Sequence, residues 1–196
     1  MVETLLVDEY FNEIKDKVSQ IDLSIVNKIL RHWRSFQLER TRTRGYSPNS
    51  RRVFIIGNGG SCAISEHIST DLNKRCKVKA LTLSNNSMQT ALTNDYGQDQ
   101  AFIQWMKIND FNSTDFLVAI SSSGKSKNIL NAIRYANDCL AYSLSIFGMD
   151  GNLDFLSLDK NDYKHYFIHI DSYHYGVIEL VSEIILHGIA EELVLE

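Results

Sequence analysis

The feature that most constrains this chain is a regular alternation of short apolar runs with segments of helical periodicity. Five runs, at 53–56, 80–83, 116–120, 143–147 and 166–170, have the length and continuity of buried parallel strands. Helical patterns lie between them at about 63–75, 88–106 and 126–139, and a long one closes the chain at about 175–195. Strand and helix in alternation predict right-handed crossovers and a parallel sheet covered on both faces, which is a three-layer α/β fold.

Two further helical patterns precede the first predicted strand. Apolar residues recur at spacings of three and four over about 7–20 and 23–38, and Asp22 can cap the second segment. We expect an N-terminal helical hairpin over about residues 1–45, with apolar faces used in oligomer packing. The 196 residues leave room for one α/β domain, so we expect a single domain over 1–196.

The composition excludes some classes of protein. A net charge of −4 lacks the basic excess of a nucleic-acid binder, so no nucleic-acid partner is expected. Cys62, Cys76 and Cys139 form no CxxC pair, which favours free thiols in a reducing compartment. The start of the chain does not resemble a signal peptide, and no stretch is apolar enough for a membrane span. We therefore expect a cytoplasmic protein without membrane contact.

The first candidate ligand loop follows the first predicted strand directly, as Gly57-Asn58-Gly59-Gly60-Ser61. Glycines let a ligand approach the backbone closely, and the next helix presents unpaired N–H groups and its positive dipole end. The loop is not GxGxxG, and no Walker lysine follows, so a dinucleotide or nucleoside-triphosphate site is disfavoured. The alternative is a plain strand-to-helix turn, which does not need five small or turn-forming residues in a row.

The second candidate loop follows the third predicted strand, as Ser121-Ser122-Ser123-Gly124-Lys125-Ser126. Its hydroxyls and amides are neutral donors that suit a phosphate monoester, and Lys125 adds a cation. The alternative is a helix N-cap with spare serines, which accounts for one serine rather than four.

Two helical segments carry candidate metal ligands at spacings of four. His67 and Asp71 share one helix face, and Glu179, Glu183 and His187 share another. If the two helices meet, imidazoles and carboxylates converge in a set that suits zinc or another divalent ion. Alternatively they are ordinary surface pairs, worth about 0.2–0.5 kcal/mol each.

The two loops together resemble the signature loops of the SIS (sugar isomerase) family. The stretch Leu83-Ser84-Asn85-Asn86-Ser87, followed by 90–97, is similar to the branch of this family that isomerises sedoheptulose 7-phosphate. The resemblance covers nearly the whole chain. It implies a flavodoxin-like fold, a homotetramer with active sites at subunit interfaces, zinc in the active site, and D-glycero-D-manno-heptose 7-phosphate as the product.

The resemblance also implies roles for individual residues. It makes Asp71 and His187 the catalytic pair and adds His67 and Glu179 to them as metal ligands. Asp71 stands where the family has glutamate, and Glu179 stands where it has glutamine. The loops and the resemblance together predict these substrate and phosphate contacts: Asn58, Gly59, Gly60, Ser61, Arg75, Asn94, Asp95, Ser121, Ser122, Ser123, Lys125, Ser126 and Glu179.

These expectations amount to an aldose–ketose isomerase that moves a proton between C1 and C2 through an enediol(ate). An isomerase for a different phosphosugar is also compatible with the sequence. A second alternative is a non-catalytic module that senses a phosphosugar or binds a protein, such as the relative that associates with a bacterial replication initiator. A structural tetramer without a ligand is a third, and it leaves two Ser/Gly loops without a purpose.

Overall fold

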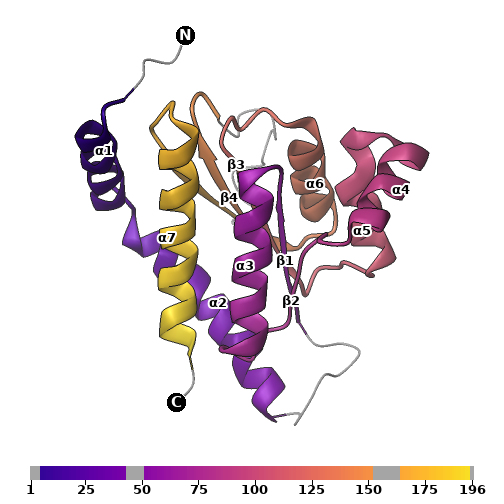
Figure 1. The fold of residues 1–196 in the computed structure, drawn as a ribbon. Coiled ribbons are helices and arrows are strands. Elements are labelled where there is room, and N and C mark those ends of the chain that lie inside the picture. Colours follow the sequence, from indigo (N-terminus) through magenta and orange to yellow (C-terminus); the bar gives the residue numbers. More distant parts are fainter. Residues whose placement is uncertain (1–4, 43–50, 152–163, 195–196) are drawn as a thin grey trace.

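The computed structural model describes residues 5–42, 51–151 and 164–194. Its centre is a five-stranded sheet in the order β2-β1-β3-β4-β5, and every neighbouring pair of strands is parallel (Figure 1). The strands are β1 (Val53–Gly57), β2 (Ala80–Leu81), β3 (Phe116–Ser121), β4 (Tyr142–Gly148) and β5 (His165–Ile170). The predicted parallel sheet is confirmed.

Helices cover both faces of the sheet, because successive strand residues point to opposite sides and both sides are apolar. Val53 and Ile55 face α3 (Gly60–Lys74) and α7 (Tyr175–Leu193), whereas Phe54 and Ile56 belong to the other core. That second core is closed by α5 (Ala101–Ile108) and α6 (Lys127–Asp138), with one residue, Leu92, from α4 (Asn86–Tyr96). The three-layer fold predicted from the alternation is therefore confirmed.

The two predicted N-terminal helices are present as α1 (Val7–Ser19) and α2 (Leu23–Arg42). The backbone N–H of Ser24 donates to Asp22 Oδ1 at 2.8 Å, as expected of a cap, and hydrogen bonding by the side chain and then the backbone N–H of Ser24 lowers the pKa of Asp22. Both helices contact α7, and they follow one another down the domain rather than folding back as a hairpin (Figure 1). Residues 1–4 and 43–45 of the expected hairpin lie outside the described residues.

Two expectations need correction. The single helix predicted over 88–106 is interrupted, because Gly97 ends α4 with a φ of 81°, a value that only glycine adopts readily. A short 3₁₀ turn, η1 (Gln98–Gln100), leads from there into α5. The second strand was expected over 80–83, but only Ala80 and Leu81 pair with β1.

The register of the central strands places the two candidate loops side by side. Gly57, the last residue of β1, lies opposite Ile120, and β3 then ends at Ser121. Both loops therefore leave the same edge of the sheet from neighbouring strands. Within the described ranges, no helix combines the length and the apolar character that crossing a bilayer requires.

Candidate active site

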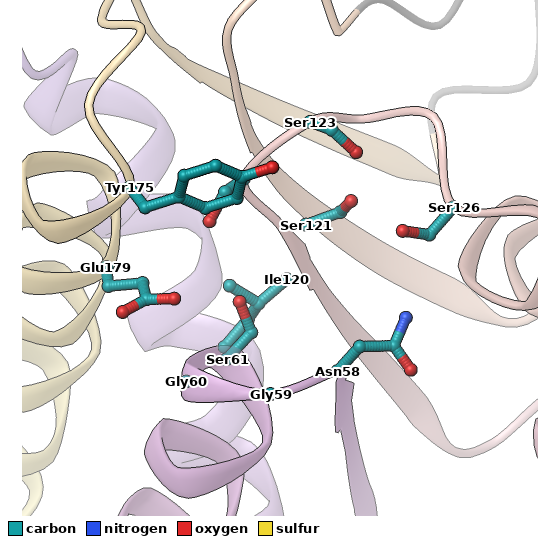
Figure 2. Close-up of a pocket in the computed structure, with 11 residues that line it drawn as sticks. Asn58, Gly59, Gly60, Ser61, Ile120, Ser121, Ser123, Ser126, Tyr175 and Glu179 are labelled. Carbon is teal, nitrogen blue, oxygen red and sulfur yellow. The ribbon is translucent and has the colours of Figure 1, made fainter. Parts of the chain in front are cut away.

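A cavity of about 350 Å³ opens at the carboxyl ends of β1 and β3, where parallel α/β sheets bind ligands. Both predicted loops contribute to it, and the first turns of α7 close the opposite side (Figure 2). The lining residues are Asn58, Gly59, Gly60, Ser61, Ile120, Ser121, Ser122, Ser123, Ser126, Tyr175 and Glu179.

The first loop turns at a glycine and is fastened by an amide pair. Gly59 precedes α3 with a φ of 57°, which suits glycine. Asn58 and Asn128, on α6, exchange two side-chain hydrogen bonds of 3.0 and 2.9 Å. The loop after β1 is thereby fastened to the helix that follows the loop after β3.

The second loop uses some of its hydroxyls to shape itself. Ser121 Oγ accepts the N–H of Gly124 at 3.1 Å, and Ser123 Oγ accepts the N–H of Lys125 at 3.2 Å. Each of these hydroxyls accepts a bond and keeps its own O–H to donate to a ligand. Ser126 occupies the N-cap position of α6 but makes no side-chain capping bond. A simple capping role therefore does not explain these serines.

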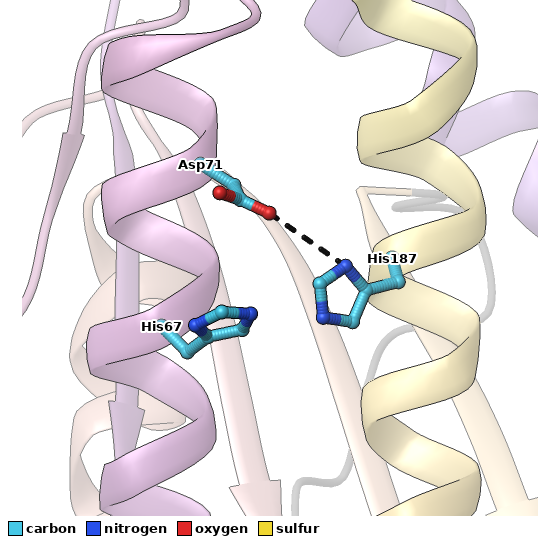
Figure 3. A group of neighbouring side chains, drawn as sticks. All are labelled: His67, Asp71 and His187. Carbon is cyan, nitrogen blue, oxygen red and sulfur yellow. Dashed lines mark ion pairs between the residues drawn. The ribbon is translucent and has the colours of Figure 1, made fainter.

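A second group of polar side chains lies between α3 and α7. One ligand atom from each of His67, Asp71 and His187 lies within 4.8 Å of the other two (Figure 3). Asp71 Oδ2 is 3.7 Å from His187 Nδ1, and the two imidazole centroids are 4.9 Å apart. Two imidazole nitrogens and a carboxylate are donors that zinc accepts, so these residues fit a divalent metal. We call this group the His–Asp–His cluster.

Further charges surround the His–Asp–His cluster. Arg75 Nη1 lies 3.2 Å from Asp71 Oδ2 and 2.6 Å from Glu191 Oε1, and hydrogen bonding to Glu191 raises the pKa of Arg75. The same bonding lowers the pKa of Glu191. Glu183 Oε1 lies 3.7 Å from His187 Nε2, on the side away from Asp71. Arg75 therefore neutralises carboxylates at the far end of the two helices, away from the cavity.

The structure does not bring Glu179 to the His–Asp–His cluster. Glu179 precedes His187 by eight residues on α7, which is about 12 Å along a helix. Its carboxylate lies against Gly60, so closely that a side chain there would collide with it. The four-residue metal set expected from the resemblance is reduced to three within one protomer, and Glu179 belongs to the cavity.

The SIS domain profile matches residues 46–146, which is just over half of the 196-residue chain and includes both loops of the cavity. The chain belongs to the SIS-domain family.

Several relatives of this SIS domain carry the name phosphoheptose isomerase. A phosphoheptose isomerase of Helicobacter pylori (strain P12) is 38% identical over 109 residues, which are 53% of this chain and 56% of that protein. The chain thus matches little more than half the length of that relative. The phosphoheptose isomerase of Syntrophotalea carbinolica is 27% identical over 190 residues, which are 93% of each chain. A phosphoheptose isomerase structure from Francisella tularensis shares the fold, with a TM-score of 0.78, 23% identity and 95% coverage of both chains.

Four residues expected to contact the substrate lie outside the cavity of this SIS domain. Lys125 is exposed and its Nζ pairs with Asp150 Oδ2 at 3.0 Å, so the cation expected beside the phosphate points elsewhere. Asn94 and Asp95 are exposed on α4 and bond to each other at 2.9 Å. Arg75 lies beyond the His–Asp–His cluster, at the other end of α3.

Sequence reasoning missed three residues of the site. Tyr175 and Ile120 line the cavity, and Asn128 fixes Asn58. Ile120 is part of an apolar strand, and Tyr175 is an exposed aromatic at the start of a helix, so neither carries a signal of its own. Asn128 sits two residues after the serine loop, and that position on the first turn of a helix was the available clue.

Proposed function

We propose that this SIS domain is an aldose–ketose isomerase of a phosphosugar, and that its substrate is sedoheptulose 7-phosphate. The product would be D-glycero-D-manno-heptose 7-phosphate, formed through an enediol(ate). One observation carries the proposal: two Ser/Gly loops from neighbouring strands share one cavity of about 350 Å³. The names of the relatives support the choice of sugar.

In this proposal the loop after β3 binds the phosphate. Ser121, Ser122, Ser123 and Ser126 line the cavity there, and neutral O–H and N–H donors suit a monoester anion. Asn58, Gly59, Gly60 and Ser61 contact the remainder of the sugar from the loop after β1. The proposal does not need Lys125 as a phosphate ligand.

The His–Asp–His cluster is the proposed metal centre, with zinc as the proposed ion. His67, Asp71 and His187 would hold it, with Arg75 shielding the excess negative charge. A bound divalent ion polarises a carbonyl and its neighbouring hydroxyl. We assign to Asp71 and His187 the transfer of protons between the two sugar oxygens.

The separation of the cavity from this cluster supports a homo-oligomer with interfacial sites. Asp71 follows Gly60 by eleven residues on α3, which is about 16 Å along the helix, so one protomer does not bring both to one small ligand. Leu180 and Ile184 expose 40% and 43% of their surface beside the cluster helix face, and Phe11 on α1 exposes 65%. We propose that these apolar side chains pack in a homotetramer, with the whole chain forming one cytoplasmic SIS domain.

The test uses purified protein and a panel of ketose phosphates, with and without a chelator, followed by NMR. Appearance of the heptose 7-phosphate, lost with the chelator and restored by zinc, would support both the activity and the metal. Turnover of another ketose phosphate in preference would change the substrate. Binding of phosphosugars without any turnover would favour the non-catalytic sensing module instead. Light scattering on the same sample tests the tetramer.

A further inference from the structure

The cavity contains a carboxylate for which sequence analysis predicts no proton-transfer role. Glu179 lies one turn into α7, and its oxygens approach Gly60 at the start of α3. Figure 2 shows Glu179 and Tyr175 on one side of the cavity, with Ser121, Ser123 and Ser126 across from them. A ligand that fills the cavity therefore has hydroxyl donors at one end and a carboxylate at the other.

Glu179 is the one carboxylate among the described residues that line this cavity. The other lining side chains offer one amide, several hydroxyls, a phenol and an isoleucine. Hydroxyls ordinarily hold their protons near neutral pH, whereas a carboxylate can accept one. Chemistry that begins by removing a proton from carbon therefore has one evident acceptor in this lining.

The bonding of Glu179 leaves its carboxylate available. It forms no hydrogen bond or ion pair with another described residue, in contrast to Asp71 and Glu191, which both contact Arg75. The first turn of α3 lies beside it, and the N-terminal end of a helix favours negative charge. The side chain is partly exposed and lines the cavity, so its carboxylate is free to contact a ligand there.

Charge sets the direction in which a phosphosugar would enter. The phosphate and the Glu179 carboxylate repel each other, so the phosphate lies at the serine loop and the carbonyl end of the sugar lies toward Glu179. This places the C1–H and C2–H bonds, between which an aldose–ketose isomerase moves its proton, at the carboxylate end of the cavity.

We infer that Glu179 is the base that carries the carbon-bound proton of the isomerisation. It accepts a proton from C1 of the ketose, the C1–H electron pair forms the C1=C2 bond, and the C2 carbonyl electrons move to O2, which takes up a proton. The O1 proton then leaves, C1=O1 forms, and the C1=C2 electrons take the proton at C2 from the Glu179 carboxyl. The proton lost from O1 balances the one gained by O2, so no external oxidant or reductant is needed.

This inference rests on the proposed function and adds to it, because Asp71 and His187 are assigned only the oxygen-bound protons. It also gives a chemical purpose to a carboxylate at a position where the resemblance implies a neutral amide. A carbon base in the cavity belongs to the same protomer as the phosphate loop, so it does not depend on a subunit contact.

The experiment measures turnover of sedoheptulose 7-phosphate and incorporation of deuterium from D₂O into the sugar carbon by NMR. We expect Glu179→Gln to lose at least about 100-fold in kcat, the usual contribution of a general base, with little change in KM. Deuterium incorporation should fall in parallel, while inorganic phosphate still binds. Glu179→Asp keeps the carboxylate and should recover a measurable part of the exchange. Glu192→Gln removes the same charge from the same helix outside the cavity and should behave as wild type.

Two results would overturn the assignment. If Glu179→Gln turns over and exchanges within about threefold of wild type, the base lies elsewhere. If Glu179→Gln and Glu179→Asp both lose deuterium exchange and also lose phosphate binding, then Glu179 shapes the site and is not the base. The wild-type protein is assayed first. If it binds the sugar but neither isomerises it nor exchanges its carbon-bound proton, the proposed function itself fails. If wild type and Glu179→Gln are both active, only the assignment of Glu179 fails.

Discussion

Asn58 and Asn128 bind each other through both of their amide groups, at 3.0 and 2.9 Å, although seventy residues separate them in the chain. Asn58 belongs to the loop after β1, and Asn128 is buried in the first turn of α6. Each amide donates once and accepts once, so the two loops of the cavity are fixed relative to each other by a closed pair of bonds.

Replacing Asn128 with alanine should loosen the cavity and destabilise the fold. The change removes both hydrogen bonds that the amides exchange, and each is worth about 0.5–1.5 kcal/mol net. Urea denaturation measures the loss, and calorimetric titration with the phosphosugar should show weaker binding. Asn137→Ala, at the other end of α6, is the matched control. Unaltered stability and affinity in Asn128→Ala would contradict the linking role.

Metal binding should depend on three residues and not on Glu179. His67→Ala and His187→Gln should each lower the zinc content of the purified protein well below one ion per protomer, because each removes a nitrogen donor. Glu179→Gln should retain the metal, since its side chain lies about 12 Å along the helix from His187. Atomic emission on dialysed samples is the measurement. A comparable loss of zinc in Glu179→Gln would return Glu179 to the ligand set.

The glycines of the first loop should respond differently to the same small change. A Cβ at Gly57 would lie 2.5 Å from the backbone oxygen of Ser61, which cannot move without the loop, whereas a Cβ at Gly60 meets the flexible end of Glu179. Gly57→Ala should therefore lower the melting temperature more than Gly60→Ala does. Gly60→Ala should instead lower kcat by displacing the carboxylate. Equal effects on stability, with activity intact in Gly60→Ala, would argue against this distinction.

His165 should make the protein less stable in mild acid. Burial lowers the pKa of His165 to about 4, and its Nε2 has no partner among the described residues. The unfolded chain takes up this proton near pH 6.5, so between these two pKa values it binds more protons than the folded chain, and stability falls as the pH falls. The loss attributable to His165 is about 2 kcal/mol between pH 7 and 5. Urea titrations of His165→Phe should show a shallower pH dependence, and His169→Phe, exposed on the same strand, should not.

The fold was predictable from the sequence because its short apolar runs are continuous, as expected of strands that are buried on both faces of a sheet. Val53 to Ile56 are fully buried on both faces of the sheet, and such a run is recognisable without coordinates. The break at Gly97 was harder to place, because apolar spacing continues on both sides and a single glycine is tolerated in many helices. The pairing of only two residues in β2 depends on its neighbour β1 rather than on its own composition.

The site was predictable where its residues are adjacent in the sequence. It was not predictable where it depends on how far side chains from different elements extend toward one another. The two loops form one cavity because each follows a strand directly. Helical periodicity placed Glu179 and His187 on one face, but a shared face does not mean a shared metal when two turns separate the residues. Lys125 turned away because Asp150, a residue from another loop, provides a partner that no local pattern announces.

The adjacency of β1 and β3 links ligand binding to folding. Gly57 and Ile120 are neighbours in the sheet although β2, α4 and α5 lie between them in the chain, so the cavity is complete only when this long-range pairing has formed. Anything that binds there stabilises the fully folded chain alone, by an amount that grows with the logarithm of its concentration. The supply of phosphosugar in the cell would thus protect the protein from proteolysis, and starvation for that sugar would shorten its lifetime.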